Sequence, residues 1–367
     1  MKIAIFHNLP PGGAQRTVYE QAKALRKNHQ LYFFHLTGLN QRFFNLQSFC
    51  QQTQRFTYQS NSQLPGPLSR LHQDYRNFVT LNQVHQKIAQ IIDQSNFDAC
   101  LLHPDKHTQA PFLLRHLKTP GLYYCHELLR LAYEPELAIP PGLSLPKRLY
   151  EQATRKIRKQ IDKHNANQAS LILTNSRFIL KKINQVYHPQ ALLCYPGVDT
   201  QVFKPHNTKK LNQVLFIAAK HKLTGYDLAK KALSLIKSNL RPQLKIIDKF
   251  SLTDKQLAKI YSQSLTTLCL SYHEPFGSTS LESMACATPV IAVKQGGYKE
   301  TVIDKKTGYL IPRNPQVLAD KIVQLIKQPL IDSKMGQTGQ QHVKQNFTWQ
   351  THNQLLEKNL NQIAHET

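Results

Sequence analysis

The chain has 367 residues, enough for two domains that each bury a core of their own. Its hydrophobic content is 41%, and no apolar run is long enough for a transmembrane helix or a signal peptide, so a soluble globular protein is expected. The 47 basic and 22 acidic residues give a formal net charge of +25, which indicates either attraction to a polyanion or simply the composition of a basic proteome.

No zinc-finger spacing, aromatic RNA-binding signature or basic zipper accompanies this charge, so no specific nucleic-acid partner is predicted. An anionic lipid surface and a phosphorylated small molecule fit the charge better. The six cysteines are scattered without metal-like pairing, which indicates reduced thiols in a cytoplasmic protein.

Apolar runs alternate with helical stretches along the chain, which predicts an α/β protein with mostly parallel sheets. The predicted strands of the first half are Lys2–Phe6, Leu31–His35, Ala99–His103, Leu122–Cys125 and Ser170–Thr174. Those of the second half are Val214–Ala218, Leu244–Ile247, Thr267–Leu270 and Pro289–Val293. Turn residues between Cys194 and Pro205 mark a boundary, with a hinge near 205–212.

Two candidate ligand contacts follow strands of the first half. Gly12 and Gly13 stand between the first strand and a helix, where glycines let the backbone approach an anion at the helix N-terminus. Taken alone, such a pair is more often a tight turn. His126 follows the strand that ends at Cys125, at the edge where α/β proteins usually bind ligands. Position 130 is arginine, so HELLR is not a HExxH zinc motif and an ordinary loop histidine is the alternative.

A strongly basic helix is predicted across residues 146–163. Its weakly apolar stripe consists of Leu149, Ala153, Ile157 and Ile161, and seven lysines and arginines cover much of the remaining surface. A membrane-surface helix would show this pattern, but the stripe is narrow, so ordinary packing of the stripe on a sheet is favoured. Electrostatic docking of the basic face is compatible with that packing.

The segment 271–311 carries the most informative pattern. Two carboxylates, Glu274 and Glu282, flank a turn and a helix predicted to start near Gly277 or Ser278, and a buried strand follows from Pro289. The free N–H groups and positive dipole end of that helix suit a phosphate. The two glutamates can accept hydrogen bonds from hydroxyls on either side. The alternative is a capped helix whose glutamates face solvent.

The sequence EPFGxxxLExMAxxTPVIAxxxGGxxExVxxxxTGYLI, from Glu274 to Ile311, closely resembles the donor-site signature of retaining GT-B glycosyltransferases of family 4. The glycine loop at Pro10–Arg16 and the segment at Cys194–Pro205 resemble that family as well. The resemblance implies two Rossmann-like domains facing each other across a cleft. Residues 1–205 would form the acceptor-side domain, 206–349 the donor domain, and a C-terminal helix at 350–367 would pack back on the first domain.

The resemblance also implies roles for individual residues. His126 would contact the transferred sugar, Glu274 would bind its hydroxyls, and Glu282 would bind the ribose. Arg130 is expected on the acceptor side. Backbone N–H groups from Phe276 to Thr279 would bind the diphosphate. The full set of expected donor contacts is Gly12, Gly13, Glu274, Phe276, Gly277, Ser278, Thr279, Glu282, Gly296 and Gly297.

The sequence departs from the family in one loop. Family members carry an arginine and a lysine that neutralise the leaving diphosphate. Anchoring on Gly225 places Ala219 and Thr224 at those positions. Lys220 or Lys222 in the same loop can supply the charge, although lysine lacks arginine's bidentate fork. A solvated basic loop is the equal alternative, and it predicts a noncatalytic protein that binds sugar nucleotides.

The implied activity is hexosyl transfer from a nucleoside diphosphate sugar to an acceptor hydroxyl with retention at the anomeric carbon. No carboxylate is placed as a covalent nucleophile, so front-side attack is expected. No metal or other cofactor is expected. The expected acceptor is a glycan or lipid-linked molecule of cell-envelope synthesis, and the expected location is the cytoplasm, in peripheral contact with the anionic inner face of the cytoplasmic membrane.

Overall fold

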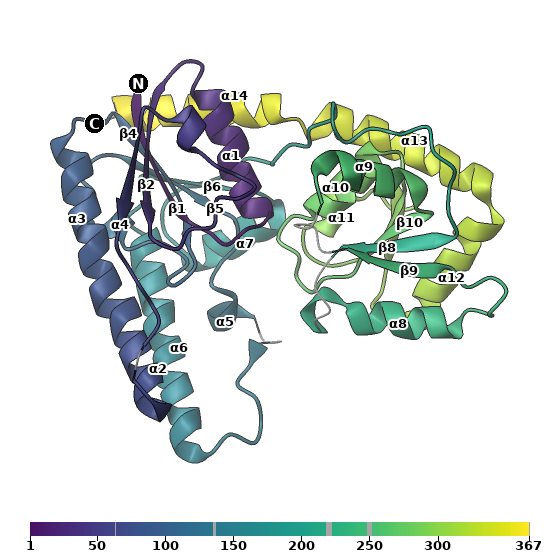
Figure 1. Cartoon of the computed structure of the whole chain (residues 1–367), viewed down its shortest axis with the longest axis horizontal. Helices are drawn as coiled ribbons and strands as arrows, with labels where there is room; N and C mark the ends of the chain where they lie inside the picture. The colour runs from purple at the N-terminus through teal and green to yellow at the C-terminus, as the bar shows by residue number, and fades with distance from the viewer. Residues whose placement is uncertain (63, 135–136, 218–221, 248–251, 367) are drawn as a thin grey trace. The chain divides into compact units, whose positions relative to one another are not determined.

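The computed structural model describes residues 1–62, 64–134, 137–217, 222–247 and 252–366. The chain forms two compact units (Figure 1). Unit 1 comprises Met1–Asn175, Ile179–Cys194 and the residues from Asn353 onward, and unit 2 comprises Ser176–Phe178 and Tyr195–His352. Each unit is built on a parallel sheet flanked by helices, which confirms the predicted α/β class.

Unit 1 contains a seven-stranded sheet in the order β3-β2-β1-β4-β5-β6-β7. All its neighbouring strands pair in parallel, and Ile3 in the central β1 lies between Leu31 and Ala99. Such strands are buried on both faces, which explains the near-continuous apolar run of β1. The strands are β1 Lys2–Asn8, β2 Gln30–Leu36, β3 Gln52–Phe56, β4 Ala99–Asp105, β5 Gly121–Cys125, β6 Leu171–Thr174 and β7 Ala191–Leu193.

The helices of unit 1 cover this sheet and include the end of the chain. Leu356, Leu360 and Ile363 of the last helix, α14, are buried in the same core as Ile3 and Ile5 of β1. The helices are α1 Gly13–Leu25, α2 Gly66–Tyr75, α3 Leu81–Gln94, α4 Leu113–His116, α5 Arg130–Tyr133, α6 Leu145–Ala166, α7 Arg177–Val186 and α14 Trp349–His365. One π-turn, η2 Arg76–Thr80, joins α2 to α3, and a 3-10 turn, η1 Gln47–Phe49, precedes β3.

Unit 2 contains a five-stranded parallel sheet in the order β12-β11-β10-β8-β9. Its strands are β8 Gln213–Ile217, β9 Gln243–Ile247, β10 Thr266–Cys269, β11 Val290–Val293 and β12 Gly308–Ile311. Its helices are η4 Lys222–Thr224, α8 Tyr226–Leu235, α9 Asp254–Gln263, α10 Ser278–Ala285, α11 Tyr298–Thr301, α12 Pro315–Lys327 and α13 Pro329–Asn346.

The segment 195–205 belongs to unit 2, whereas the sequence placed it in the first domain. Val198 and Phe203 are buried in the core of unit 2, and the N–H of Val198 donates to the carbonyl of Phe347 at 3.0 Å. Gly197 also packs tightly, because a Cβ there would lie 2.2 Å from the backbone nitrogen of Trp349. These contacts fix the segment to unit 2 although its turn residues look like a linker.

The basic helix α6 presents a different face to the core than the sequence predicted. Leu149, Ala153 and Ile157 are exposed, and the buried residues are Thr154, Asp162, Asn165 and Ala166. The expectation that the apolar stripe packs on the sheet was therefore wrong. Small and polar residues occupy the buried face of α6 because they form hydrogen bonds within unit 1. The Tyr187 hydroxyl, for example, donates to Asp162 at 2.6 Å. In the described part of the chain, no helix is both long and apolar enough to cross a membrane.

Candidate active site

The strand order of unit 2 marks a candidate ligand site at one edge of its sheet. The chain passes from β8 to β9 on one side and then returns to β10 on the other side of β8. In open parallel sheets, ligands bind at such a switch point, outside the carboxyl ends of the strands. The loop that leaves β10 contains residues 270–277, and residues 222–225 lead from the β8 side into α8, while residues 218–221 lie outside the described residues. These are the two loops that the sequence singled out for a phosphorylated ligand.

The loop after β10 leads into the N-terminus of α10. Gly277 precedes the helix in a left-handed conformation with φ +99°, and the helix runs from Ser278 to Ala285. Gly277 has no side chain to cap the first turn, and the Ser280 N–H donates to the Gly277 carbonyl at 2.9 Å. The N–H groups of Ser278 and Thr279, which precede it at the helix N-terminus, are the candidates for binding an acceptor. Ser278 and Thr279 are half-buried, and Phe276 is buried in the core of unit 2. The predicted helix start, Gly277 or Ser278, is confirmed.

The glycine pair at 296–297 holds this loop in place. The N–H of Gly297 donates to the carbonyl of Glu274 at 2.8 Å. A Cβ on Gly296 would lie 2.4 Å from that same carbonyl oxygen, and a Cβ on Gly297 would lie 2.5 Å from Phe276 Cα. Gly296 also has φ +55°, where side chains are strained. Both glycines therefore permit close backbone contact with the Glu274 loop. This packing explains why glycine stands at both positions, which the sequence assigned to donor contact.

Glu282 is more buried than expected. Its side chain is part of α10, the residue is only 2% exposed, and its Oε2 accepts a hydrogen bond from the Tyr261 hydroxyl at 3.0 Å. Burial, followed by the neighbouring Glu282 carboxylate, raises the pKa of Tyr261 well above its usual value. Glu274, by contrast, is half-buried in the loop. The roles of Glu274 in sugar binding and of Glu282 in ribose binding stay predictions.

The basic loop after β8 is partly described. Lys220 lies outside the described residues, and Lys222 begins η4, with its backbone described. The end of this loop packs on the Glu274 loop: Tyr272 N–H donates to the Leu223 carbonyl at 2.8 Å. A Cβ on Gly225 would lie 2.4 Å from the Leu270 carbonyl oxygen. The backbone of Lys222 is thus held beside the loop that carries Glu274.

Unit 1 has its own switch point, between β1 and β4. Asn8 and Asp105 end these strands, and the Asn8 amide donates to the Asp105 carboxylate at 2.8 Å. A polar cavity of about 500 Å³ opens here, lined by Asn8, Thr37, Gly38, Tyr58, Gln59, Ser60, Asn61, Lys106 and His107. The buried Asn8 Oδ1 has no hydrogen-bond partner among the described residues, so an acceptor atom is left for a ligand or water.

Gly12 and Gly13 follow β1 at the same edge of the sheet. Gly13 begins α1, and the N–H of Arg16 donates to the Gly12 carbonyl at 3.0 Å. The nearest atom to a Cβ on Gly12 would be the Pro10 carbonyl oxygen at 3.8 Å, an ordinary contact. The described structure therefore does not itself demand glycine at position 12. Their assignment to donor contact stays a prediction.

His126 is buried and lies within hydrogen-bond distance of a second histidine. Its Nε2 lies 3.0 Å from Nδ1 of His103, which belongs to the adjacent strand β4, and the two rings stack at 5.3 Å. Asn175 fixes the backbone by donating to the His126 carbonyl at 2.8 Å. The sequence predicted no role for His103. A signal was present, because the predicted strand Ala99–His103 ends at this histidine and His126 directly follows the next predicted strand, Leu122–Cys125.

Arg130 makes an ion pair within unit 1. Its Nε lies 2.8 Å from Glu134 Oε2, and Lys182 Nζ lies 3.5 Å from the other oxygen of that buried carboxylate. The pairing orients Arg130, and its acceptor-side role stays a prediction. Among the described residues, no group of three or more His, Cys, Asp or Glu is placed to hold a metal ion.

Comparison with known proteins defines the class. A sucrose-phosphate synthase from Thermosynechococcus elongatus has the same fold, with a TM-score of 0.75 at 19% identity over 100% of both chains. Anabaena Alr3699/HepE, solved with UDP-glucose, gives a TM-score of 0.74 at 19% identity, over 99% of this chain and 100% of that one. The two parallel-sheet units therefore have the GT-B glycosyltransferase fold.

Two protein-family models match the chain and identify its family. The model described as Glycosyltransferase Family 4 matches residues 11–202, and the one described as Glycosyl transferases group 1 matches residues 249–342. The chain belongs to glycosyltransferase family 4. This confirms the resemblance found in the segment 274–311.

Curated relatives match parts of the chain. Alpha-1,3/1,6-mannosyltransferase ALG2 of Rhizomucor pusillus is 40% identical over 98 residues, 27% of this chain and 22% of that protein. An uncharacterised glycosyltransferase, MJ1178 of Methanocaldococcus jannaschii, is 26% identical over 207 residues, 51% of this chain and 58% of that protein. The chain thus spans less than two thirds of the length of these relatives.

Proposed function

We propose that this protein transfers a hexosyl unit from a nucleoside diphosphate sugar to an acceptor hydroxyl, with retention at the anomeric carbon. The observation that carries the proposal is the switch point of unit 2. There the N-terminus of α10, which has no side-chain cap, and the half-buried Glu274 follow a loop that hydrogen bonds to Leu223, near the end of the basic loop after β8. Amide groups, a carboxylate and lysines are the groups that bind a diphosphate and sugar hydroxyls. Anabaena Alr3699/HepE, of the same fold, was solved with UDP-glucose, which supports this donor class.

In the proposed reaction, the bond between the anomeric carbon and the β-phosphate oxygen breaks and its electron pair leaves with the diphosphate. The acceptor oxygen bonds to that carbon on the same face, and its proton passes to a phosphate oxygen. The α10 amides and Lys220 or Lys222 stabilise the charge that develops on the diphosphate. Glu274 binds sugar hydroxyls and Glu282 binds the ribose. No metal cofactor is proposed, and turnover that survives EDTA would support this part.

We propose unit 1 as the acceptor side. The polar cavity at the ends of β1 to β4 carries amide, hydroxyl and ammonium groups that suit a polyol, and His126 contacts the transferred sugar. The acceptor is a glycan or lipid-linked molecule of cell-envelope synthesis. We place the protein in the cytoplasm, in peripheral contact with the anionic inner face of the membrane, and its net charge of +25 supports the membrane contact.

Mass spectrometry of products tests the proposal. The full chain is incubated with a panel of UDP- and GDP-sugars and a membrane extract as acceptor. We expect one donor to give a product heavier by one hexosyl unit, and Lys220→Ala with Lys222→Ala to lower turnover more than donor binding. Nucleotide binding without transfer or hydrolysis across the panel would instead favour the noncatalytic alternative, which Ala219 and Thr224 motivate.

A further inference from the structure

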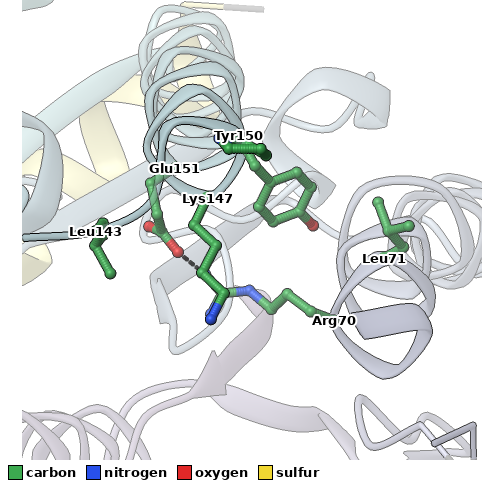
Figure 2. Close-up of a pocket in the computed structure, with 7 residues that line it drawn as sticks. Arg70, Leu71, Leu143, Lys147, Tyr150 and Glu151 are labelled. Carbon is green, nitrogen blue, oxygen red and sulfur yellow. Dashed lines mark hydrogen bonds and ion pairs between the residues drawn. The ribbon is translucent and has the colours of Figure 1, made fainter. Parts of the chain in front are cut away.

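Two helices of unit 1 carry an unusual distribution of polar and apolar side chains. Figure 1 shows α2 and α6 side by side, and their N-terminal ends extend beyond the sheet of unit 1. Polar side chains join the two helices. The Tyr150 hydroxyl donates to Asp74 at 2.6 Å. Arg70 donates to Glu151 at 2.9 Å, an interaction drawn in Figure 2. Arg158 also pairs with Asp74, which is only 4% exposed. Charged groups thus hold the helices together.

Leucines occupy the outer surface at the free ends of these helices. Leu68 and Leu71 of α2 are 56% and 52% exposed, and Leu145 and Leu149 of α6 are 69% and 56% exposed. Leu64, which precedes α2, and Leu143, which precedes α6, are exposed as well, and Leu71 and Leu143 line one cavity. We name the six exposed leucines at these helix ends the apolar tip: Leu64, Leu68, Leu71, Leu143, Leu145 and Leu149. Exposed apolar side chains that gather on a soluble protein usually mark an interaction site.

The tip also contains a groove and basic side chains. A cavity of about 400 Å³ lies between the two helices, lined by Arg70, Leu71, Leu143, Pro146, Lys147, Tyr150 and Glu151. In Figure 2, Arg70 reaches from α2 to Glu151 of α6, with Leu71 and Leu143 at the edges. Lys147 and Arg148, in the first turn of α6, are exposed next to the leucines. Apolar residues flanked by exposed cations are typical of surfaces that lie in a membrane interface.

We infer that the apolar tip inserts into the interfacial layer of an anionic phospholipid membrane. Lys147 and Arg148 then lie at the level of the lipid headgroups. Charge complementarity favours a membrane over a protein partner, because lysine is depleted in protein–protein interfaces whereas each cation near an anionic leaflet contributes attraction. The sequence predicted electrostatic contact through the basic helix alone. The structure adds exposed leucines on two helices, which extends the membrane contact given under the proposed function. The biological reason for such a contact rests on that proposed function, whereas membrane binding itself does not.

Vesicle co-sedimentation of the full chain without any donor tests this inference. Vesicles of phosphatidylcholine alone are compared with vesicles that also contain phosphatidylglycerol. We expect the parent to bind the anionic vesicles and to retain part of the binding at high salt. Leu68→Ser, Leu71→Ser, Leu145→Ser and Leu149→Ser together should weaken binding by at least about tenfold, because apolar burial in the interface is lost. Lys147→Gln with Arg148→Gln should remove the preference for anionic vesicles.

The matched control is Leu330→Ser with Ile331→Ser, in α13 of unit 2, where the two residues are 86% and 43% exposed. This variant should bind like the parent, and circular dichroism should show that all variants are folded. Equal binding of the leucine variant and the parent would overturn the inference. So would a parent dimer that becomes a monomer in the leucine variant, because a second copy would then cover the tip. Failure of sugar transfer alone would contradict the proposed function and leave vesicle binding intact.

Discussion

The imidazole Nε2 of His126 lies 3.0 Å from Nδ1 of His103, and both rings are buried in unit 1. His103 lies in β4 and His126 directly follows the adjacent parallel strand β5. The Tyr124 ring stacks on His103 and packs at a tilt against His126. A hydrogen bond to one ring nitrogen fixes the tautomer and orientation of an imidazole. His103 is therefore in place to position His126.

Replacing His103 should reduce turnover through His126. His103→Asn keeps a hydrogen-bonding group near the Nδ1 position, whereas His103→Leu removes it. We expect His103→Leu to lower kcat on the order of tenfold with a smaller change in donor KM, and His103→Asn to retain more activity. Steady-state kinetics of the two variants measures the difference. Equal kinetics of both variants and the parent would exclude the positioning role.

The two signature glutamates should respond differently to truncation, because Glu282 is buried and Glu274 is half-buried. Glu274→Ala removes a half-buried side chain and should cost donor use on the order of 1.5–3 kcal/mol with little change in stability. Glu282→Ala leaves the buried Tyr261 hydroxyl without its carboxylate partner, which should cost about 1–3 kcal/mol of unfolding free energy in addition.

Urea unfolding and donor kinetics on both variants separate these effects. Tyr261→Phe is the companion variant, because it removes this donor from the buried Glu282 carboxylate and should lower stability as well. Parent-like kinetics for both glutamate variants would refute the donor-site assignment. Equal stability of Glu282→Ala and Glu274→Ala would show that the buried hydrogen bond contributes little.

Gly296→Ala should weaken donor binding by moving the Glu274 loop, because a Cβ on Gly296 would meet the Glu274 carbonyl oxygen at 2.4 Å. Gly142 offers a matched control: it has φ +93°, but a Cβ there would meet no described atom within 4 Å. Both changes should cost about 1–2 kcal/mol from the left-handed backbone. Only Gly296→Ala should lower the free energy of unfolding further and reduce nucleotide affinity. Calorimetry with UDP and GDP, combined with urea unfolding, measures both quantities. Equal stability and equal nucleotide affinity of the two variants would contradict the role of Gly296 in holding the Glu274 loop.

Acid should destabilise the protein below about pH 6.5, the usual histidine pKa. Burial lowers the pKa of His352 to about 4, that of His85 to about 4 and that of His7 to about 3. In the unfolded chain these histidines take up protons near pH 6.5 while the folded chain does not, so their stability contribution is present above that pH and is lost as pH falls toward 4. Asp162 acts oppositely: burial raises its pKa to about 7, so stability falls as pH rises from about 4 to 7.

The pKa values of His35, His107, His116 and His342 are lowered by burial as well, so the histidines outweigh the one carboxyl group and the free energy of unfolding should rise from pH 4.5 to 6. His352→Asn should make that rise less steep, because it removes one of the buried histidines. Urea unfolding across this range measures both slopes. A flat profile for the parent, or one unchanged by His352→Asn, would contradict the assignment of neutral buried histidines.

The sequence predicted the elements whose patterns are local. The nine predicted strands all appear, and the helix at Ser278 begins as expected because the glycine and the following helix formers define it. Three strands were missed for identifiable reasons. β3 is largely polar, β7 has three residues, and β12 follows Thr307, where the pattern indicated a turn.

Features that depend on tertiary packing could not be predicted in the same way. The His103 contact requires the register of β4 and β5, and the burial of Glu282 requires the position of Tyr261 on α9. The face of α6 was predicted from a stripe of apolar residues, but hydrogen bonds of Asp162 and Asn165 decide which side is buried. Periodicity alone does not contain these partners.

The central claim is that the loops after β8 and β10 bind the diphosphate of a sugar nucleotide. Isothermal titration of UDP and GDP into the full chain, compared with Gly296→Ala and Glu282→Gln, tests it most directly. We predict that one nucleotide binds the parent at a single site and that both variants bind it more weakly. Absence of binding by either nucleotide, or equal affinity of the parent and both variants, would contradict the account.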